Sequence, residues 1–306
     1  MNCSVCGKDA VIDIPYMNKR LCQVHFLDHF ESVFMKEVRQ QIKFDSGGGT
    51  VSVALSGGKD SSVTLYILHS ILSVRRKVKV KAFTVDEGIS GYRDKSIQTA
   101  GELCRSLGVE HTVISYSEVF GTTMDSEVTR LRGKTPCAVC GPMRRQLINM
   151  AAQTQGSDYV ALGLNMDDVA QSVLMNVSRG DMERISRMAP HSHSVNGLVR
   201  RVIPLRRLSE REIVTYALLK NIKYDHSWCP YYAQAQRNLF RKIVSEIEEK
   251  YPGSKLAMIR LQEDIAGRYT NPGDLSLGTC RNCGRPSSGQ LCSVCMISGE
   301  NDDGNQ

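Results

Sequence analysis

A glycine-rich segment, Ser56-Gly57-Gly58-Lys59-Asp60-Ser61, has the composition of a phosphate-binding loop. It follows an alternating apolar stretch at residues 51–55 and runs into a helical pattern at residues 61–73. Glycines let a backbone approach an anion closely, and the N-terminus of a helix turns its N–H groups and its positive end toward the same anion. The segment therefore predicts a phosphate site, the alternative being an ordinary Gly-Gly turn before a helix.

The spacing of the segment decides which kind of phosphate loop it resembles. A Walker loop requires Gly, four residues and then Gly-Lys-Ser/Thr, a pattern that is absent here. Residues 56–61 instead resemble the PP-loop of ATP pyrophosphatases, enzymes that split ATP between the α and β phosphates. This resemblance implies that ATP is a substrate and that AMP is transferred to an oxygen atom of a second substrate.

Two terminal groups of cysteines have the spacing of zinc ligands. Pairs separated by two residues, with a short insert between the pairs, can wrap one tetrahedral ion, and four soft donors describe a closed structural site. The alternative is a set of unpaired reduced thiols. The N-terminal group is Cys3, Cys6, Cys22 and His25, and the C-terminal group is Cys280, Cys283, Cys292 and Cys295.

Three more cysteines, Cys137, Cys140 and the distant Cys229, leave several kinds of chemistry open. The Cys-x-x-Cys pair alone is weak evidence, compatible with a redox dithiol, half of a zinc site or an iron–sulfur site. Three thiolates are too few for a closed zinc site, but they can hold a cluster and leave one iron open. The remaining Cys104 is predicted to be a small buried apolar residue.

Charged residues follow the predicted strands. Asp60 and Asp168 are candidate Mg²⁺ ligands, because hard oxygen ligands suit this ion, although Asp168 could equally cap a helix. Lys59, Arg144 and Arg145 could neutralise charge as pyrophosphate departs, or could be solvated surface cations. Arg144 and Arg145 lie in a segment, residues 135–145, that is predicted to be a loop before a helix.

The pattern of the middle of the chain predicts an α/β fold with a doubly wound, mostly parallel sheet. Strand-like and helix-like segments alternate, an order that implies a parallel sheet covered on both faces, with ligands at the carboxyl ends of the strands. The expected strands are 51–55, 78–85, 109–115, 158–162 and 199–204, the expected helices are 61–73, 94–107, 142–155 and 167–178, and residues 209–266 are mostly helical.

The flanking segments complete the expected domain organisation. It comprises an N-terminal zinc module at 1–26, a linking helix at 27–45, the PP-loop domain at 46–270, a C-terminal zinc ribbon at 271–298 and a disordered tail at 299–306. The 306 residues are 41% hydrophobic and 23% charged, which is ordinary for a globular protein. A net charge of +7 suits a polyanionic partner. Without a bilayer-length apolar run or a signal peptide, we expect a soluble cytoplasmic protein.

Together these motifs resemble, in chain order over residues 1–296, the tRNA 2-thiouridine synthetase family. The resemblance implies structural zinc in both terminal groups and a [4Fe-4S] cluster on Cys137, Cys140 and Cys229. It also implies that ATP is held by the PP-loop together with Ala54, Val85, Gly163, Asp168 and Arg144. Some members carry Lys where this chain has Arg144, which keeps the charge but does not suit a proton donor.

The reaction implied by the resemblance is 2-thiolation of a tRNA uridine. Mg²⁺–ATP adenylates the C2 oxygen, sulfide bound at the open iron then attacks C2, and AMP leaves. The resemblance does not choose between positions 34 and 54 of the tRNA; we favour 2-thiouridine at position 34 and keep 2-thioribothymidine synthesis at position 54 as an alternative. The sulfur donor is inorganic sulfide or a ubiquitin-like thiocarboxylated carrier, and the protein is a homodimer. Three alternatives stay open: a persulfide on Cys137 or Cys229, an amide-forming PP-loop ligase, and a non-catalytic zinc-ribbon RNA-binding protein.

Overall fold

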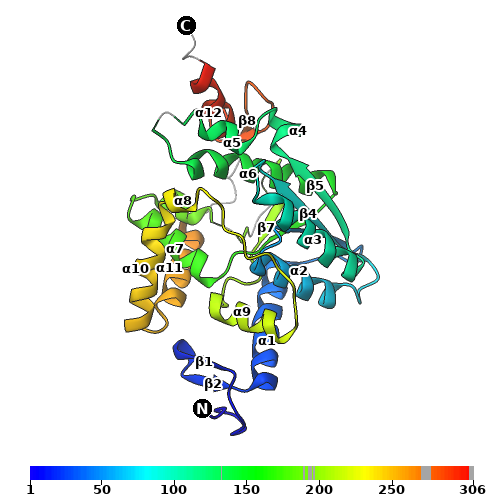
Figure 1. Ribbon diagram of the computed structural model, residues 1–306, viewed down its shortest axis with the longest axis vertical. Coiled ribbons are helices and arrows are strands. Elements are labelled where there is room, and N and C mark those ends of the chain that lie inside the picture. The colour runs from blue at the N-terminus through cyan, green and yellow to red at the C-terminus, as the bar shows by residue number, and fades with distance from the viewer. Residues whose placement is uncertain (132, 189, 192–194, 196, 270–276, 303–306) are drawn as a thin grey trace.

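The fold is a central α/β layer structure with a small cysteine module at each end. The computed structural model describes residues 1–131, 133–188, 190–191, 195, 197–269 and 277–302. The N-terminal module and the C-terminal module lie at opposite ends of the molecule, with the sheet between them (Figure 1).

The central sheet has five parallel strands in the order β5-β4-β3-β6-β7, which confirms the predicted fold class. Its middle strands are buried on both faces, as the apolar residues of a doubly covered parallel sheet require. The strands are β3 (Gly49–Ala54), β4 (Val78–Asp86), β5 (Glu110–Ser115), β6 (Tyr159–Leu162) and β7 (Arg200–Val202).

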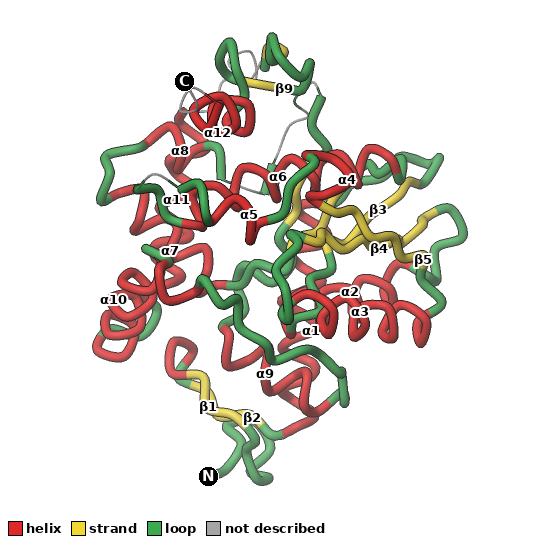
Figure 2. Tube along the Cα trace, turned by 45° about the horizontal axis from the view of Figure 1, so that its top comes forward, coloured by secondary structure: helices red, strands yellow, loops and turns green. Residues whose placement is uncertain are grey.

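Helices cover the two faces of this sheet (Figure 2). One face carries α2 (Lys59–Leu72) and α3 (Arg93–Leu107), and the other carries α4 (Tyr116–Phe120) and α6 (Pro136–Thr154), with α5 (Met124–Val128) against α6. Beside the sheet, α7 (Met166–Val177), α8 (Met182–Ser186), α10 (Arg237–Lys250) and α11 (Ser254–Tyr269) pack together.

The linking helix α1 (Gln23–Gln41) packs against α9 (Glu210–Leu219), which in turn contacts α2. Phe30 of α1 stacks on Tyr216 of α9 with 4.2 Å between ring centroids, and both rings are buried. An aromatic pair of this kind adds about 0.5–1.5 kcal/mol to the burial of its area. The N-terminal module is therefore fastened to the sheet domain through a shared apolar core.

The strand order places a ligand-binding crevice between β3 and β6. The chain runs from β3 outward to β4 and β5 and then returns to β6 on the other side of β3, which makes this a topological switch point. Ala54 pairs with Leu162 at the carboxyl ends of these strands. The loops that follow Ala54 and Leu162 therefore face each other across the crevice.

Both terminal modules contain a short antiparallel hairpin. The N-terminal one joins β1 (Ile12–Ile14) and β2 (Lys19–Leu21) through the 3-10 turn η1 (Pro15–Met17), and the C-terminal one pairs β8 (Gly278–Thr279) with β9 (Pro286–Ser287). The prediction of disorder is wrong for residues 299–302, because α12 (Ser293–Asp302) includes them. Residues 303–306 lie outside the described part of the chain.

The prediction of a loop at residues 135–145 is also wrong, since α6 begins at Pro136 after the N-cap Thr135. Proline suits the first helical position because its fixed φ matches the helix and its missing N–H would be unpaired there. A second proline, Pro142, lies inside α6, so the predicted start at residue 142 was six residues late. As a result, Cys137 and Cys140 lie three residues apart on one helix and face the same side.

Over the ranges that the structure describes, no helix combines the length and apolar character needed to cross a bilayer.

Candidate active site

The loop between β3 and α2 is shaped by hydrogen bonds among its own polar groups. The Ser56 and Ser61 hydroxyl oxygens lie 3.0 Å apart, and the Ser56 N–H donates to Ser61 Oγ at 3.1 Å. Gly57 has a φ of +82°, and a Cβ there would lie 2.2 Å from the Ser96 carbonyl oxygen. Only glycine fits this conformation at this distance. The loop leads directly into the N-terminus of α2. The N-terminus is the end of a helix that suits a phosphate, so the loop and α2 together can hold one.

The loop after β6 reaches the PP-loop because Gly163 has no side chain. A Cβ at Gly163 would lie 2.6 Å from the backbone nitrogen of Ser61. The close approach lets Asn165 Nδ2 donate to Asp60 Oδ1 at 3.0 Å. The PP-loop and the Gly163 loop, which the resemblance places together on ATP, thus lie against each other in one crevice.

Asp168 faces the site from the first turn of α7, whose N-cap is Asn165 and not Asp168 as the alternative prediction had it; Asp168 completes the capping box from the third helical position. Its N–H donates to Asn165 Oδ1 at 3.0 Å, and its Oδ2 accepts from the Asn165 N–H at 3.3 Å. Its Oδ1 accepts from Arg237 Nη1 at 3.2 Å. Burial raises the pKa of Asp168 against the attraction of Arg237, and the nearby Asp60 raises it further. A divalent cation between Asp60 and Asp168 would relieve this repulsion, so the pair suits Mg²⁺.

Lys59, the PP-loop lysine, is held between two carboxylates. Its Nζ lies 2.9 Å from Asp60 Oδ2 and 2.8 Å from Glu210 Oε1. Burial opposes its charge, but the attraction of Asp60 and Glu210 prevails and raises the pKa of Lys59. Lys59 is therefore a positive group beside the phosphate loop at neutral pH.

A buried carboxylate, Glu87, joins two arginines just beyond the end of β4. Glu87 is 0% exposed, and its Oε1 lies 2.6 Å from Arg93 Nη2 and 2.6 Å from Arg144 Nε. Burial opposes ionisation of Glu87, but the attraction of Arg144 and Arg93 prevails and lowers its pKa. The same attraction to Glu87 raises the pKa of Arg144 well above its ordinary value.

The two arginines extend this contact in opposite directions. Arg93 Nη1 donates to the carbonyl oxygen of Ser56 in the PP-loop at 3.3 Å, and Arg144 Nη2 donates to Cys140 Sγ at 3.2 Å. A continuous chain of charged groups, Arg93–Glu87–Arg144, therefore links the phosphate loop to Cys140. We call it the arginine bridge.

The three central thiols lie in one neighbourhood without converging on a point. Cys137 is exposed, Cys140 buried and Cys229 partly buried. Burial raises the pKa of Cys137 and of Cys229, and the charge of Cys140 raises both further, so the groups are close enough to repel. Their sulfur atoms are not all within 4.8 Å of one another. One tetrahedral zinc would require thiolates about 3.8 Å apart. A cluster binds each thiolate to a different iron, so it does not require the three sulfur atoms to lie this close together.

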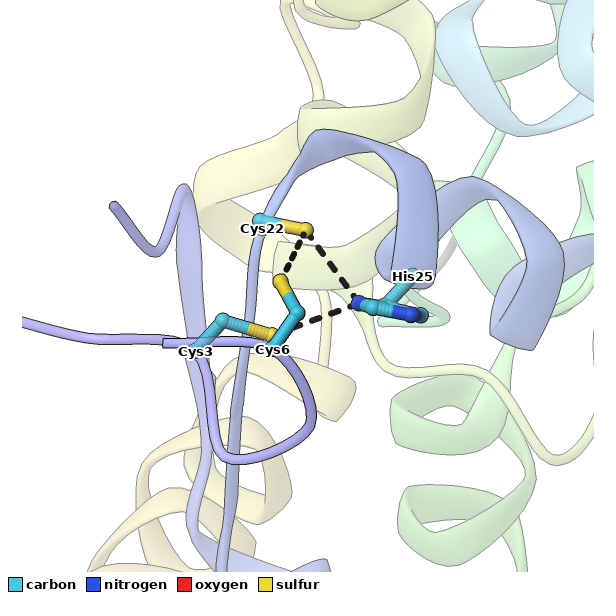
Figure 3. A group of neighbouring side chains, drawn as sticks. All are labelled: Cys3, Cys6, Cys22 and His25. Atoms are coloured by element: carbon cyan, nitrogen blue, oxygen red, sulfur yellow. Dashed lines mark hydrogen bonds between the residues drawn. The ribbon is translucent and has the colours of Figure 1, made fainter. Parts of the chain in front are cut away.

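The N-terminal group has the dimensions of a tetrahedral zinc site (Figure 3). The Cys6 and Cys22 sulfur atoms are 3.7 Å apart, and His25 Nδ1 lies 3.5 Å from Cys3 Sγ and 3.3 Å from Cys22 Sγ. Zn–S bonds of about 2.3 Å and Zn–N bonds of about 2.0 Å give tetrahedral edges of about 3.8 and 3.5 Å. Zinc therefore fits between these four side chains.

The C-terminal group has the same dimensions, and one of its thiols, Cys280, is set up to be ionised. Cys283 and Cys292 have sulfur atoms 3.7 Å apart, and the Cys292 N–H donates to Cys280 Sγ at 3.3 Å. Backbone hydrogen bonds, from Cys283 first, lower the pKa of Cys280 to about 6. Cys280 is thus a thiolate at neutral pH, the form that binds metal.

The remaining predicted site residues lie at the ends of the central strands or on α6. Ala54 is the last residue of β3, and Val85 is buried near the end of β4. Arg145 follows Arg144 on α6, and burial together with repulsion from Arg184 and Arg144 lowers its pKa.

Cys104 is 1% exposed and burial raises its pKa to about 12, which confirms it as a buried apolar residue.

Comparison with known proteins identifies the arrangement. Residues 29–247 match the PP-loop domain family, and residues 2–27 match the N-terminal LIM domain of 2-thiouridine synthetase TtuA. The chain is 32% identical to the tRNA 2-thiolation protein NcsA of Haloferax volcanii, over 97% of this chain and 98% of the relative. The chain belongs to the tRNA thiolation family. A second relative in this family, the tRNA-5-methyluridine(54) 2-sulfurtransferase of Thermus thermophilus, is 33% identical over 97% of this chain and 91% of its own.

A solved structure from the tRNA thiolation family has the same fold throughout. The U34-tRNA thiolase NcsA of Methanococcus maripaludis, with its [4Fe-4S] cluster, superimposes with a TM-score of 0.85 at 30% identity. The match covers 98% of this chain and 96% of that one. The flanking modules therefore belong to the family architecture together with the PP-loop domain.

The sequence did not point to Arg93 or Arg237 in this thiolation-family site. Arg237 meets Asp168 across 69 residues of sequence, and no local motif marks it. Arg93 reaches the Ser56 carbonyl across 37 residues. The only available signal was Glu87, a charged residue at the end of an apolar strand.

The first prediction for this thiolation-family protein concerns replacement of its zinc ligands. We expect Cys3→Ser and Cys280→Ser each to lose one of two bound zinc ions and to lower the unfolding temperature. The physical reason is that zinc contributes folding free energy to modules whose own cores are small. Zinc content and thermal unfolding measure both effects. Cys104→Ala is the matched control, since Cys104 is buried away from both groups and should keep two zinc ions. Unchanged zinc in both terminal variants would contradict the assignment.

Proposed function

We propose that this protein catalyses 2-thiolation of a tRNA uridine, with ATP cleaved to AMP and pyrophosphate. The observation that carries the proposal is the arginine bridge. It ties the carbonyl of PP-loop residue Ser56 to the thiol of Cys140, so the phosphate site and the three central thiols form one centre. An amide-forming ligase or a zinc-ribbon binding protein has no use for such a connection.

In the activation step, the loop and its neighbours hold ATP. The backbone of residues 56–61 and the N-terminus of α2 bind phosphate, and Ala54, Val85 and Gly163 line the nucleotide. Asp60 and Asp168 hold Mg²⁺, and Lys59 stabilises the charge that develops as pyrophosphate leaves. The C2 oxygen of the uridine takes up AMP, which converts a poor leaving group into a good one.

For the sulfur step, Cys137, Cys140 and Cys229 would hold a [4Fe-4S] cluster. The named cluster of the Methanococcus maripaludis structure supports this ligand set. When bound, such a cluster supplies an open iron position for the sulfur that is transferred. A C2–S bond forms, the C2–O bond breaks and AMP departs. Arg144 stays charged throughout and stabilises negative charge next to Cys140 without giving up a proton.

We extend the proposal to the position of the substrate uridine, the sulfur donor and the surroundings of the protein. The substrate uridine is at position 34, as in the name of the Methanococcus maripaludis structure. The sulfur donor is inorganic sulfide or a thiocarboxylated carrier protein, and the protein acts in the cytoplasm as a homodimer. Zinc in both terminal groups serves the fold, because neither group keeps an open ligand position.

The test is pyrophosphate release that depends on tRNA. We expect Asp60→Ala to lower the rate by about 100-fold or more, because the Mg²⁺ that Asp60 would hold, and with it a positive charge beside the departing pyrophosphate, is lost. Cys104→Ala, away from the crevice, should match the unaltered protein. Nucleoside analysis of the product RNA should then find 2-thiouridine at position 34. Release of ADP and phosphate as the main products would contradict the proposal, and sulfur at position 54 would reassign the substrate.

A further inference from the structure

The only tryptophan of the chain, Trp228, lies on the surface directly before Cys229. Its side chain is 64% exposed, although an indole is among the side chains that gain most from burial. It belongs to the connection between α9 and α10, which crosses the molecule (Figure 1). The position is therefore unfavourable for the isolated protein and adjacent to the proposed sulfur site.

The exposed ring of Trp228 is held by contacts with Tyr232 and Arg241. Tyr232 packs against Trp228 edge to face, with 4.9 Å between centroids and 63° between planes. The Arg241 guanidinium lies 5.8 Å from the Trp228 centroid and 5.4 Å from that of Tyr232, and Arg241 Nη1 donates to the Tyr232 hydroxyl at 2.8 Å. These contacts hold the indole by cation–π and aromatic interactions, so one large flat surface is presented in a set orientation.

The surrounding backbone is anchored to the active centre. The Tyr231 hydroxyl donates to Asp125 Oδ1 at 2.6 Å, and Asp125 Oδ2 accepts from the Ser90 N–H at 2.9 Å. On α10, Arg241 lies one turn after Arg237, which pairs with Asp168. Trp228 is thus linked to Cys229 through the chain and, through Arg241 and α10, to the helix that carries Arg237, the partner of Asp168.

We propose that Trp228, backed by Arg241 and Tyr232, is a stacking platform for the nucleobase next to the target uridine. The inference rests on the proposed function and names a subsite of it. An exposed indole with an arginine behind it matches the way proteins hold unpaired bases, by stacking on an aromatic face with cationic support. The target uridine must reach Cys229, and Trp228 is its chain neighbour. The base on the platform is therefore a flanking one.

The first experiment uses the single tryptophan as its own probe. Trp228 fluorescence should fall when an RNA stem-loop with the target uridine in its loop binds, because the base covers the indole. Trp228→Ala should weaken RNA binding by about 5- to 100-fold, and Trp228→Phe should recover part of the loss. Tyr251→Ala is the matched control: Tyr251 is an aromatic residue, 70% exposed, at the far end of α10, and its variant should bind normally.

The second experiment identifies what stacks. The same stem-loop with an abasic nucleotide beside the target uridine should lose as much affinity for the unaltered protein as Trp228→Ala loses for the intact RNA. Combining the abasic RNA with Trp228→Ala should lower the affinity little further, since each change removes the same contact. Fully additive losses, or unchanged fluorescence on binding, would overturn the platform and would show that Trp228 faces another partner. If the unaltered protein released no pyrophosphate in response to tRNA, the proposed function itself would instead be overturned.

Discussion

Replacing Cys137, Cys140 or Cys229 by serine is expected to abolish tRNA thiolation while sparing pyrophosphate release from ATP. The phosphate site depends on residues of the PP-loop and of the β6 loop, whereas the three thiols lie on α6 and in the connection before α10. Serine keeps a hydrogen-bond acceptor for Arg144 at position 140, so the arginine bridge should survive. Thiolated RNA, pyrophosphate, and iron and sulfide content of anaerobically purified protein measure the separate effects.

This experiment also separates the cluster from a persulfide. With a cluster, all three variants lose iron and the visible absorption that accompanies it, and their losses of thiolation are equal. With a persulfide, Cys140→Ser would keep activity and iron-stripped protein would turn over repeatedly once it was supplied with sulfur. Cys104→Ser is the matched control and should retain iron and thiolation. Full turnover by iron-stripped protein would exclude the cluster and leave the PP-loop assignment intact.

The parts of the site that the sequence predicted are those whose geometry is contained in a short stretch of chain. The PP-loop is one turn between a strand and a helix, so the order of its residues already describes its shape. The zinc groups are pairs at a spacing of two residues, and each pair reaches one ion from a single turn. The sheet followed from alternating strands and helices, because right-handed crossovers leave few other topologies.

The parts that the sequence did not predict depend on tertiary contacts or on exceptions to local rules. Arg237 meets Asp168 only because α10 packs on α7. The helical start of residues 136–141 was missed because Gly141 and Pro142 usually end helices, and a proline inside a helix costs about 3 kcal/mol. Burial of the remainder of α6, including Leu147 and Ala152, compensates for that cost. Local propensity gave the wrong structure there because packing outweighed it.

Glu87→Gln is expected to destabilise the protein and to slow both halves of the reaction. The change keeps the shape of the side chain but removes its charge, which leaves Arg93, 7% exposed, without its counter-ion. Breaking a buried ion pair in this way costs about 3–5 kcal/mol, which corresponds to roughly 10 °C in the unfolding temperature of a domain of this size. Denaturant unfolding gives the free energy, and pyrophosphate and thiolation assays give the rates.

The pH dependence of stability tests the same charge. The pKa of Glu87 is lowered in the folded protein. The contribution of the Glu87 charge to the free energy of unfolding is therefore complete above the pKa that Glu87 has in the unfolded chain. The contribution is lost as the pH falls through the lowered pKa. The free energy of unfolding of the unaltered protein should therefore decline on acidification, and that of Glu87→Gln should decline less.

A matched control and a second substitution separate the bridge from charge in general. Glu110→Gln removes a carboxylate that is 58% exposed and pairs with Lys81 at the surface, so it should change stability by less than about 1 kcal/mol. Glu87→Gln leaves Arg93 and Arg144 without a counter-ion, and adding Arg144→Gln removes one of these two charges. The double variant should therefore lose less free energy of unfolding than the two single variants lose in sum. Thiolation should stay low in the double variant even where stability returns, because Cys140 has then lost its cationic neighbour. A Glu87→Gln protein as stable and as active as the Glu110→Gln control would show that the arginine bridge has no role.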